Sequence, residues 1–270
     1  MKKLLSFATN HPVLFVLGAL IAWLAIWILF LAIAAGALGR PYSESVPMTL
    51  SRLATILCLL LLLWRMGWLK DAGIIQLGSW RLWLIALAGI GYIIPASLYS
   101  FFGKATLNAS ALLQNPAALT NIMENFVVAV NEEIFFRGLV LLVLLRAWGA
   151  RKWGLIGSVL LTSLIFSLPH LVQVFSGGIP TGAAPLLILQ TLAVSIWWGA
   201  LVASGGSIWP AVLAHFIGNS VITLQALTAT VIEPVSMSYQ RLLLFSLPLG
   251  VLGLCLLFSS SKKLKAAREI

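Results

Sequence analysis

The chain has 270 residues, of which 61% are hydrophobic and only 9% are charged, and its formal net charge is +10. A soluble domain usually carries about 25% charged residues, so these few charges could not cover a water-exposed surface of ordinary size. The composition therefore excludes a disordered chain, a disulfide scaffold and a soluble enzyme. It predicts an all-α protein, a polytopic bundle of transmembrane helices.

Eight apolar stretches are long enough to be spanning helices, which need about 20 mainly apolar residues. In chain order they cover roughly 13–38, 50–69, 82–102, 118–145, 153–175, 185–203, 207–229 and 242–258. The first follows Lys2 and Lys3 but is too long for the apolar region of a signal peptide, about 7–15 residues, so we expect a retained helix. The links are short, and we expect one integral membrane domain over residues 1–270 with about eight transmembrane helices.

The positive charge does not indicate a nucleic-acid partner, because the basic residues lie between the apolar runs. The links on one side of the predicted bundle hold twelve Lys and Arg residues, and those on the other side hold four. Cytoplasmic loops carry an excess of Lys and Arg, so we expect both termini in the cytoplasm. The lipid bilayer is the expected surrounding, and the short loops favour a bacterial cytoplasmic membrane. Cys58 and Cys255 lie inside apolar runs and indicate no compartment.

One charged cluster lies deep inside an apolar run, in the fourth predicted helix. It contains Glu132, Glu133 and Arg137, and a carboxylate near the bilayer centre costs about 2.5–3.5 kcal/mol. Glu133 and Arg137 are four residues apart in the favourable order, so they can pair on one helix face. A purely structural ion pair would explain these two residues but not Glu132, which has no cation three or four residues further on. Glu132 is therefore the candidate general base.

Two later helices carry the intramembrane histidines. His170 follows Pro169, which removes a backbone donor and tends to bend the helix. His215 and Asn219 are four residues apart and share a helix face. An imidazole N–H and an amide N–H could together stabilise a developing oxyanion. With a carboxylate and an imidazole to move the proton of a water molecule, these groups suffice to hydrolyse an amide inside a membrane.

At these residues the sequence resembles the CPBP family (CAAX proteases and bacteriocin-processing enzymes, also called ABI), which contains glutamic intramembrane endopeptidases. This family includes the eukaryotic Ras-converting CAAX protease. The resemblance covers roughly residues 132–219, within a catalytic core that we expect over 118–229. It rests on three motifs in order: Glu132-Glu133-x-x-x-Arg137, Phe166-x-x-x-His170 and His215-x-x-x-Asn219.

The resemblance implies an eight-helix fold with a cavity open to lipid or water. It implies these catalytic positions: Glu132 as the water-activating glutamate, His170 as its partner, Glu133 and Arg137 as the supporting pair, and His215 and Asn219 as the oxyanion-binding positions. The partner would be a peptide or protein substrate that can itself be membrane-associated, and we expect no cofactor and no metal. Family members cleave near the C-terminus of prenylated proteins or process small peptides, and others are linked to bacteriocin immunity.

Three other functions remain open. A zinc-dependent membrane protease could use Glu132, His170 and His215 as three ligands with water as the fourth, although the chain has no His-Glu-x-x-His motif. A transporter or channel could use the buried charges as an ion path, but these residues cluster at one level and show no inverted repeat. The third possible function is that of a partner-binding protein without catalytic activity, such as a bacteriocin-immunity type membrane protein.

Overall fold

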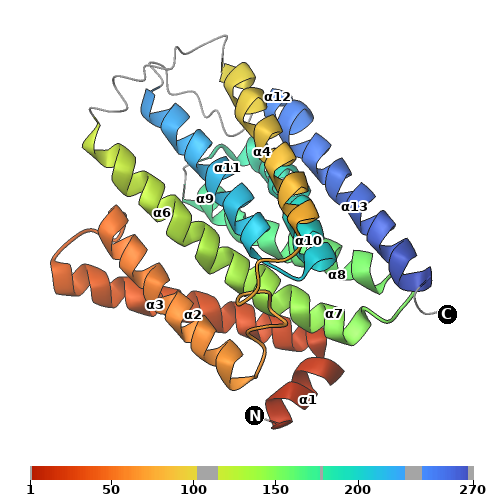
Figure 1. Cartoon of the computed structure of the whole chain (residues 1–270). Coiled ribbons are helices and arrows are strands. Elements are labelled where there is room, and N and C mark those ends of the chain that lie inside the picture. The colour runs from red at the N-terminus through yellow and green to blue at the C-terminus, as the bar shows by residue number, and fades with distance from the viewer. Residues whose placement is uncertain (1, 102–114, 177–178, 229–238, 267–270) are drawn as a thin grey trace.

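The computed structural model describes residues 2–101, 115–176, 179–228 and 239–266. Within these ranges the chain forms helices and no strand (Figure 1), which confirms the predicted all-α class. In chain order the elements are α1 (Lys2–Asn10), α2 (Pro12–Leu38), α3 (Ser45–Arg65), α4 (Trp80–Phe101), α6 (Pro116–Glu133), the π-helix η1 (Ile134–Leu141), α7 (Leu142–Trp148), α8 (Gly154–Ser167), the 3₁₀-helix η2 (Leu168–Leu171), α9 (Val172–Phe175), the 3₁₀-helix η3 (Thr181–Ala183), α10 (Ala184–Gly205), α11 (Trp209–Thr228), α12 (Tyr239–Arg241), the π-helix η5 (Leu242–Ser246) and α13 (Leu247–Ala266).

Five of the described helical stretches are long and apolar enough to cross a membrane. They are Pro12–Leu38, Ser45–Arg65, Gly154–Phe175, Thr181–Gly205 and Leu242–Ser261, and Trp80–Pro95 is a shorter apolar helix. Helix α6 is not among them, and its residues include Glu124, Glu132 and Glu133. The all-helical architecture is thus established, whereas the count of eight transmembrane helices stays a prediction.

The end of α3 differs from the predicted one. The apolar pattern predicts a helix over 50–69, but α3 covers Ser45–Arg65. Gly67 has a φ of +71°, a left-handed conformation that glycine adopts without steric cost. The N–H of Trp68 then donates to the carbonyl of Leu63 at 2.8 Å, and these features end a helix. The apolar residues after Gly67 therefore belong to a turn.

A long central helical stretch, made of α6, η1 and α7, runs diagonally through the bundle (Figure 1). Helix α3 packs against both α2 and α6, while α11 packs against α6 and α4. Helix α10 packs against α8, α11 and α13. The central stretch is therefore covered by α3 and α11, and the residues at its middle lie in the interior of the bundle.

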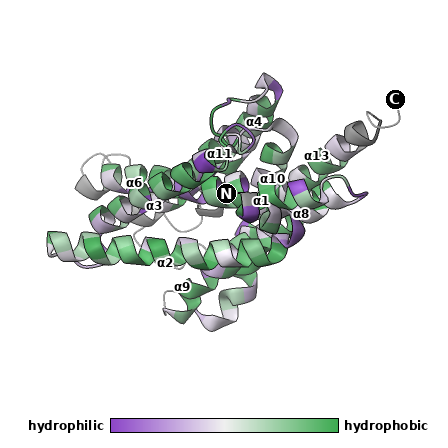
Figure 2. Ribbon diagram, turned by 90° about the horizontal axis from the view of Figure 1, so that it is seen from below, coloured by the Kyte–Doolittle hydropathy of each residue, from purple (hydrophilic) through white to green (hydrophobic). Residues whose placement is uncertain are grey.

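Helix α2 lies along the edge of the bundle and is apolar over nearly its whole length (Figure 2). Large apolar side chains such as Leu14, Ile21 and Ile28 are exposed on it. A helix that is apolar all round and exposed at the edge is stable in lipid and not in water. Its inner face is tied to α6, because Trp23 Nε1 donates to Asn131 Oδ1 at 3.2 Å. The exterior of the molecule is that of an integral membrane protein.

Candidate active site

The predicted charged cluster lies where the central helix changes its winding. Glu132 and Glu133 end α6, and Arg137 lies in the π-helix η1 that follows. All eight residues of η1 are buried. Single wide turns of this kind within α-helices occur often at functional sites, since they change the direction in which side chains project.

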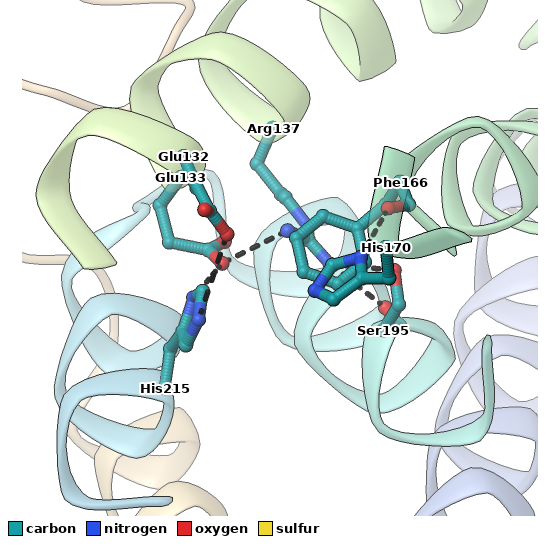
Figure 3. A network of polar contacts seen from close by, with 7 residues as sticks. All are labelled: Glu132, Glu133, Arg137, Phe166, His170, Ser195 and His215. Atoms are coloured by element: carbon teal, nitrogen blue, oxygen red, sulfur yellow. Dashed lines mark hydrogen bonds and ion pairs between the residues drawn. The ribbon is translucent and has the colours of Figure 1, made fainter. Parts of the chain in front are cut away.

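Glu133 is the fully buried centre of a polar network (Figure 3). Its Oε1 atom lies 2.8 Å from Arg137 Nη1 and 2.9 Å from His215 Nδ1, and it accepts a hydrogen bond from each. The ion pair expected between Glu133 and Arg137 is therefore present, and the same carboxylate also holds His215 of α11. A buried charge is tolerated only with such partners.

Arg137 connects this network to two more helices. Its Nη2 atom donates to Ser195 Oγ at 2.7 Å and is 3.3 Å from the Ser195 carbonyl oxygen, both in α10. Its guanidinium lies over the rings of Phe166 and Trp198, 4.8 Å and 5.4 Å from their centroids, positions where a cation is attracted by the ring faces. Ser195 was not predicted as a site residue, because the sequence around a serine in an apolar run does not indicate a contact with a residue 58 positions away.

Glu132 differs from Glu133 in its access to solvent. Its side chain is 21% exposed, and its Oε2 atom lies 3.7 Å from His215 Nε2. Both carboxylates extend toward His215 in Figure 3, and Glu132 lines two cavities, described below, whose linings do not include Glu133. The two adjacent glutamates thus have the different environments expected of neighbours about 100° apart on a helix.

His215 is fixed by contacts on several sides. Its ring stacks on Trp198 with centroids 4.1 Å apart. Because the Glu133 carboxylate only accepts hydrogen bonds, Nδ1 carries the proton, and a neutral ring then has no hydrogen at Nε2. Nε2 can therefore donate to an oxyanion only in the imidazolium form, for which the two glutamates supply countercharge.

His170 lies in η2, directly after Pro169. Helix α8 ends at Ser167 and continues as a tighter 3₁₀ turn. The Nδ1 atom of His170 lies 3.0 Å from the carbonyl oxygen of Phe166 and donates to it. The remaining Nε2 carries a lone pair and can accept a proton or bind water.

A cavity of about 360 Å³ brings four of the six predicted residues together. Glu132, His170, His215 and Asn219 all line it. His215 and Asn219 reach it from the same helix α11, as their spacing predicts. Glu133 and Arg137 are not among its lining residues and lie behind it. The sequence analysis missed other residues on the wall: Arg52, Gln173, Gln190 and Arg241.

A second cavity, of about 570 Å³, meets the first at the same groups. The two share Arg52, Glu132, His170 and Gln173. The rest of its wall is largely apolar and includes Trp23, Trp27, Leu171 and Phe175. The carboxylate of Glu132 and the ring of His170 therefore line both cavities, of which the second is the more apolar.

No metal-binding geometry is found in the part of the chain that the structure describes. No group of three or more His, Cys, Asp or Glu side chains is gathered there as a metal site requires. This holds for Glu132, His170 and His215, which would be the ligands of a zinc protease. The arrangement that the described residues do form is a carboxylate and two imidazoles around a cavity.

Comparison with known families gives a match to a model described as Rce1-like: type II CAAX prenyl endopeptidase Rce1-like, over residues 114–221. This segment is similar to the CAAX protease family. It contains all three motifs, from Glu132 to Asn219, so the resemblance to the CPBP family is confirmed. No match was found among the curated proteins or the solved structures. A match to this family indicates a hydrolase that acts on a peptide or protein.

Proposed function

We propose that the protein is an intramembrane endopeptidase in which Glu132 and His170 activate a water molecule. The observation that supports this most is the shared cavity, which is lined by both groups and by the two candidate oxyanion donors, His215 and Asn219. The match to the CAAX protease family supports peptidase activity.

In the proposed reaction a water molecule binds between the Glu132 carboxylate and Nε2 of His170. Its oxygen attacks the substrate carbonyl carbon while Glu132 takes its proton, and the carbonyl oxygen becomes an oxyanion. The amide N–H of Asn219 and the Nε2–H of an imidazolium at His215 donate to that oxyanion. The oxyanion then collapses and the C–N bond breaks, Glu132 returns the proton to the leaving amine, and the products are a carboxylic acid and an amine.

Glu133 and Arg137 act as positioning residues in this proposal. Neither lines the cavity, and their side chains are fully buried. Glu133 holds Nδ1 of His215 at 2.9 Å and so directs Nε2 toward Glu132. Arg137 in turn orients the Glu133 carboxylate from the side of α10.

We propose further that the chain crosses the membrane eight times, with both termini in the cytoplasm of a bacterial cell. Five spans and the shorter apolar helix Trp80–Pro95 support this number, as do α6 and α11, which pack between them. The chain would form one membrane domain over residues 1–270, with its catalytic core over 118–229. The main cluster of the hydrophobic core supports a single domain, because its members come from most of the chain, from Ala8 to Leu257.

The experiment that tests the function compares peptide cleavage by the purified protein and by Glu132→Gln, using a mixture of apolar peptides and mass spectrometry of the fragments. We expect the variant to release none of the fragments that the unaltered protein releases, because an amide cannot accept the proton of water. Glu44→Gln is the matched control, since Glu44 is exposed and pairs with Arg40 away from the cavity. Cleavage that persists in Glu132→Gln would remove Glu132 as the base.

A further inference from the structure

Trp198 of α10 makes a face-to-face contact with His215 of α11. The centroids of the two rings are 4.1 Å apart, and their planes are inclined to each other by only 17°. Trp198 is buried and lines the candidate active-site cavity. It lies outside the three sequence motifs and has no part in the reaction proposed above. The contact therefore places an aromatic ring of unassigned function directly against a candidate oxyanion donor.

Helix α10 supports both of the groups that Glu133 holds. Ser195 and Trp198 are three residues apart, so they project from the same face of this helix. Ser195 accepts a hydrogen bond from Arg137 at 2.7 Å. The Trp198 ring lies beneath the guanidinium of Arg137, 5.4 Å from its centroid, and stacks on His215. One face of α10 thus contacts the Arg137 and His215 side chains, both of which bind to the carboxylate of Glu133.

The indole N–H of Trp198 indicates that packing alone does not account for this residue. Its Nε1 atom is buried and has no hydrogen-bond partner among the residues that the structure describes. A buried tryptophan usually finds such a partner, and an unpaired buried donor destabilises the folded state. A phenylalanine would fill much of this space without an unpaired donor. What tryptophan adds is the aromatic face that attracts a cation most strongly.

We propose that Trp198 is a positioning residue that fixes the plane of the His215 ring and attracts its imidazolium form, the donor to the oxyanion. This inference rests on the proposed peptidase function. The hydrogen bond from Nδ1 to Glu133 lies along one edge of the ring, and by itself it lets the ring turn about that bond. The stack on Trp198 removes this freedom. Because the oxyanion exists only after water has attacked, the contact acts on turnover and not on substrate binding.

Cleavage kinetics of Trp198→Phe and Trp198→Leu test the role of the ring face. We expect Trp198→Leu to lower kcat by about 10- to 30-fold, the factor that a desolvated cation–π contact provides, with little change in KM. Trp198→Phe keeps a smaller aromatic face and should restore part of kcat. Trp197→Phe is the matched control, because Trp197 is also buried with an unpartnered Nε1 but does not line the cavity. It should lose stability to a similar extent and keep kcat.

A peptide phosphonate tests the same contact without turnover, because its P–O⁻ groups imitate the oxyanion. Its affinity is compared with that of the parent peptide on the Glu132→Gln protein in detergent. We expect Trp198→Leu to weaken phosphonate binding by the same factor as kcat and to leave the affinity for the parent peptide unchanged. When His215→Gln is already present, Trp198→Leu should cause no further loss, since Trp198 acts through His215. Trp198→Phe serves in both assays if Trp198→Leu does not fold.

The outcomes separate this inference from the function on which it rests. Unchanged phosphonate affinity in the Trp198 variants would overturn the role of Trp198, while cleavage by the unaltered protein would still support the peptidase. Equal losses of kcat in Trp197→Phe and Trp198→Phe, or a loss that persists in full beside His215→Gln, would also overturn it. Phosphonate binding that depends on both Trp198 and His215, without any cleavage, would support the contact and contradict the peptidase.

Discussion

Replacing Glu133 by glutamine separates the roles of the two neighbouring glutamates. The substitution keeps the size of the side chain but removes the charge that holds Arg137 and His215. Both contacts end on the same Oε1 atom, at 2.8 Å and 2.9 Å, inside a fully buried site. The amide oxygen of glutamine can still accept a hydrogen bond, but it cannot neutralise a buried guanidinium.

The expected cost follows from the number of charged contacts that are lost. Hydrogen bonds to charged groups contribute about 1.5–3 kcal/mol each, and removing one partner of a buried ion pair usually costs about 3–5 kcal/mol. Because the amide oxygen and the Ser195 contacts of Arg137 remain, we expect a loss near the lower end, about 3 kcal/mol in the free energy of unfolding. Activity should fall too, since the orientation of His215 depends on Glu133.

The measurement is denaturant unfolding in detergent micelles, together with peptide cleavage, for Glu133→Gln and Glu132→Gln side by side. Glu132→Gln should lose activity with almost unchanged stability, because its side chain is partly exposed to a cavity. The double variant Glu133→Gln with Arg137→Gln should recover stability relative to Glu133→Gln, since it removes the stranded cation. A stable, inactive Glu133→Gln beside an unstable Glu132→Gln would reverse the two roles and refute the reasoning.

Three further predictions concern the oxyanion donor, the metal and the topology. Asn219→Ala should lower turnover by about 10²–10³-fold, the usual cost of one lost oxyanion donor, with little change in unfolding; full turnover would mean that Asn219 only packs helices. Purified protein should cleave peptide without bound zinc, as checked by metal analysis alongside activity, and activity that is lost on chelation and restored by zinc would contradict this. Single cysteines placed near Lys70 and Arg151 should resist an impermeant thiol reagent added to intact cells, because both links are predicted to be cytoplasmic, and labelling from outside would overturn the orientation.

Hydropathy and residue spacing predict much of this architecture, because both are local properties. The helical stretches follow from apolar runs, and the Glu133–Arg137 pair follows from a four-residue separation. The four-residue spacing of His215 and Asn219 likewise predicts that they share a helix face. The end of α3 was missed because Gly67, with its left-handed backbone, stops the helix while the apolar pattern continues.

The chemistry of the site depends instead on contacts that no local pattern encodes. The proton position on His215 is decided by Glu133, 82 residues earlier in the chain. When Nδ1 donates to Glu133, Nε2 is able to donate only in the charged form. In the same way, Arg241 carries no motif, and only the folded bundle places it on the wall of the cavity that Glu132 lines.

Ser195 gives a final test of how far this polar network extends. Its hydroxyl accepts a hydrogen bond from Arg137 Nη2 at 2.7 Å, while its carbonyl oxygen, at 3.3 Å, is a weaker acceptor that a substitution would retain. Ser195→Ala should therefore lower the free energy of unfolding by about 1–3 kcal/mol. Activity should fall less than in Glu133→Gln, because the contact between Glu133 and His215 remains.

Ser158→Ala is the matched control: Ser158 is equally buried, but its hydroxyl donates to the Gly154 carbonyl within its own helix. Equal losses of stability in the two variants would show that α10 does not support Arg137 through this hydroxyl. A larger loss in Ser195→Ala, together with reduced cleavage, would mean that α10 helps to hold Arg137 and, through Glu133, His215 at the cavity.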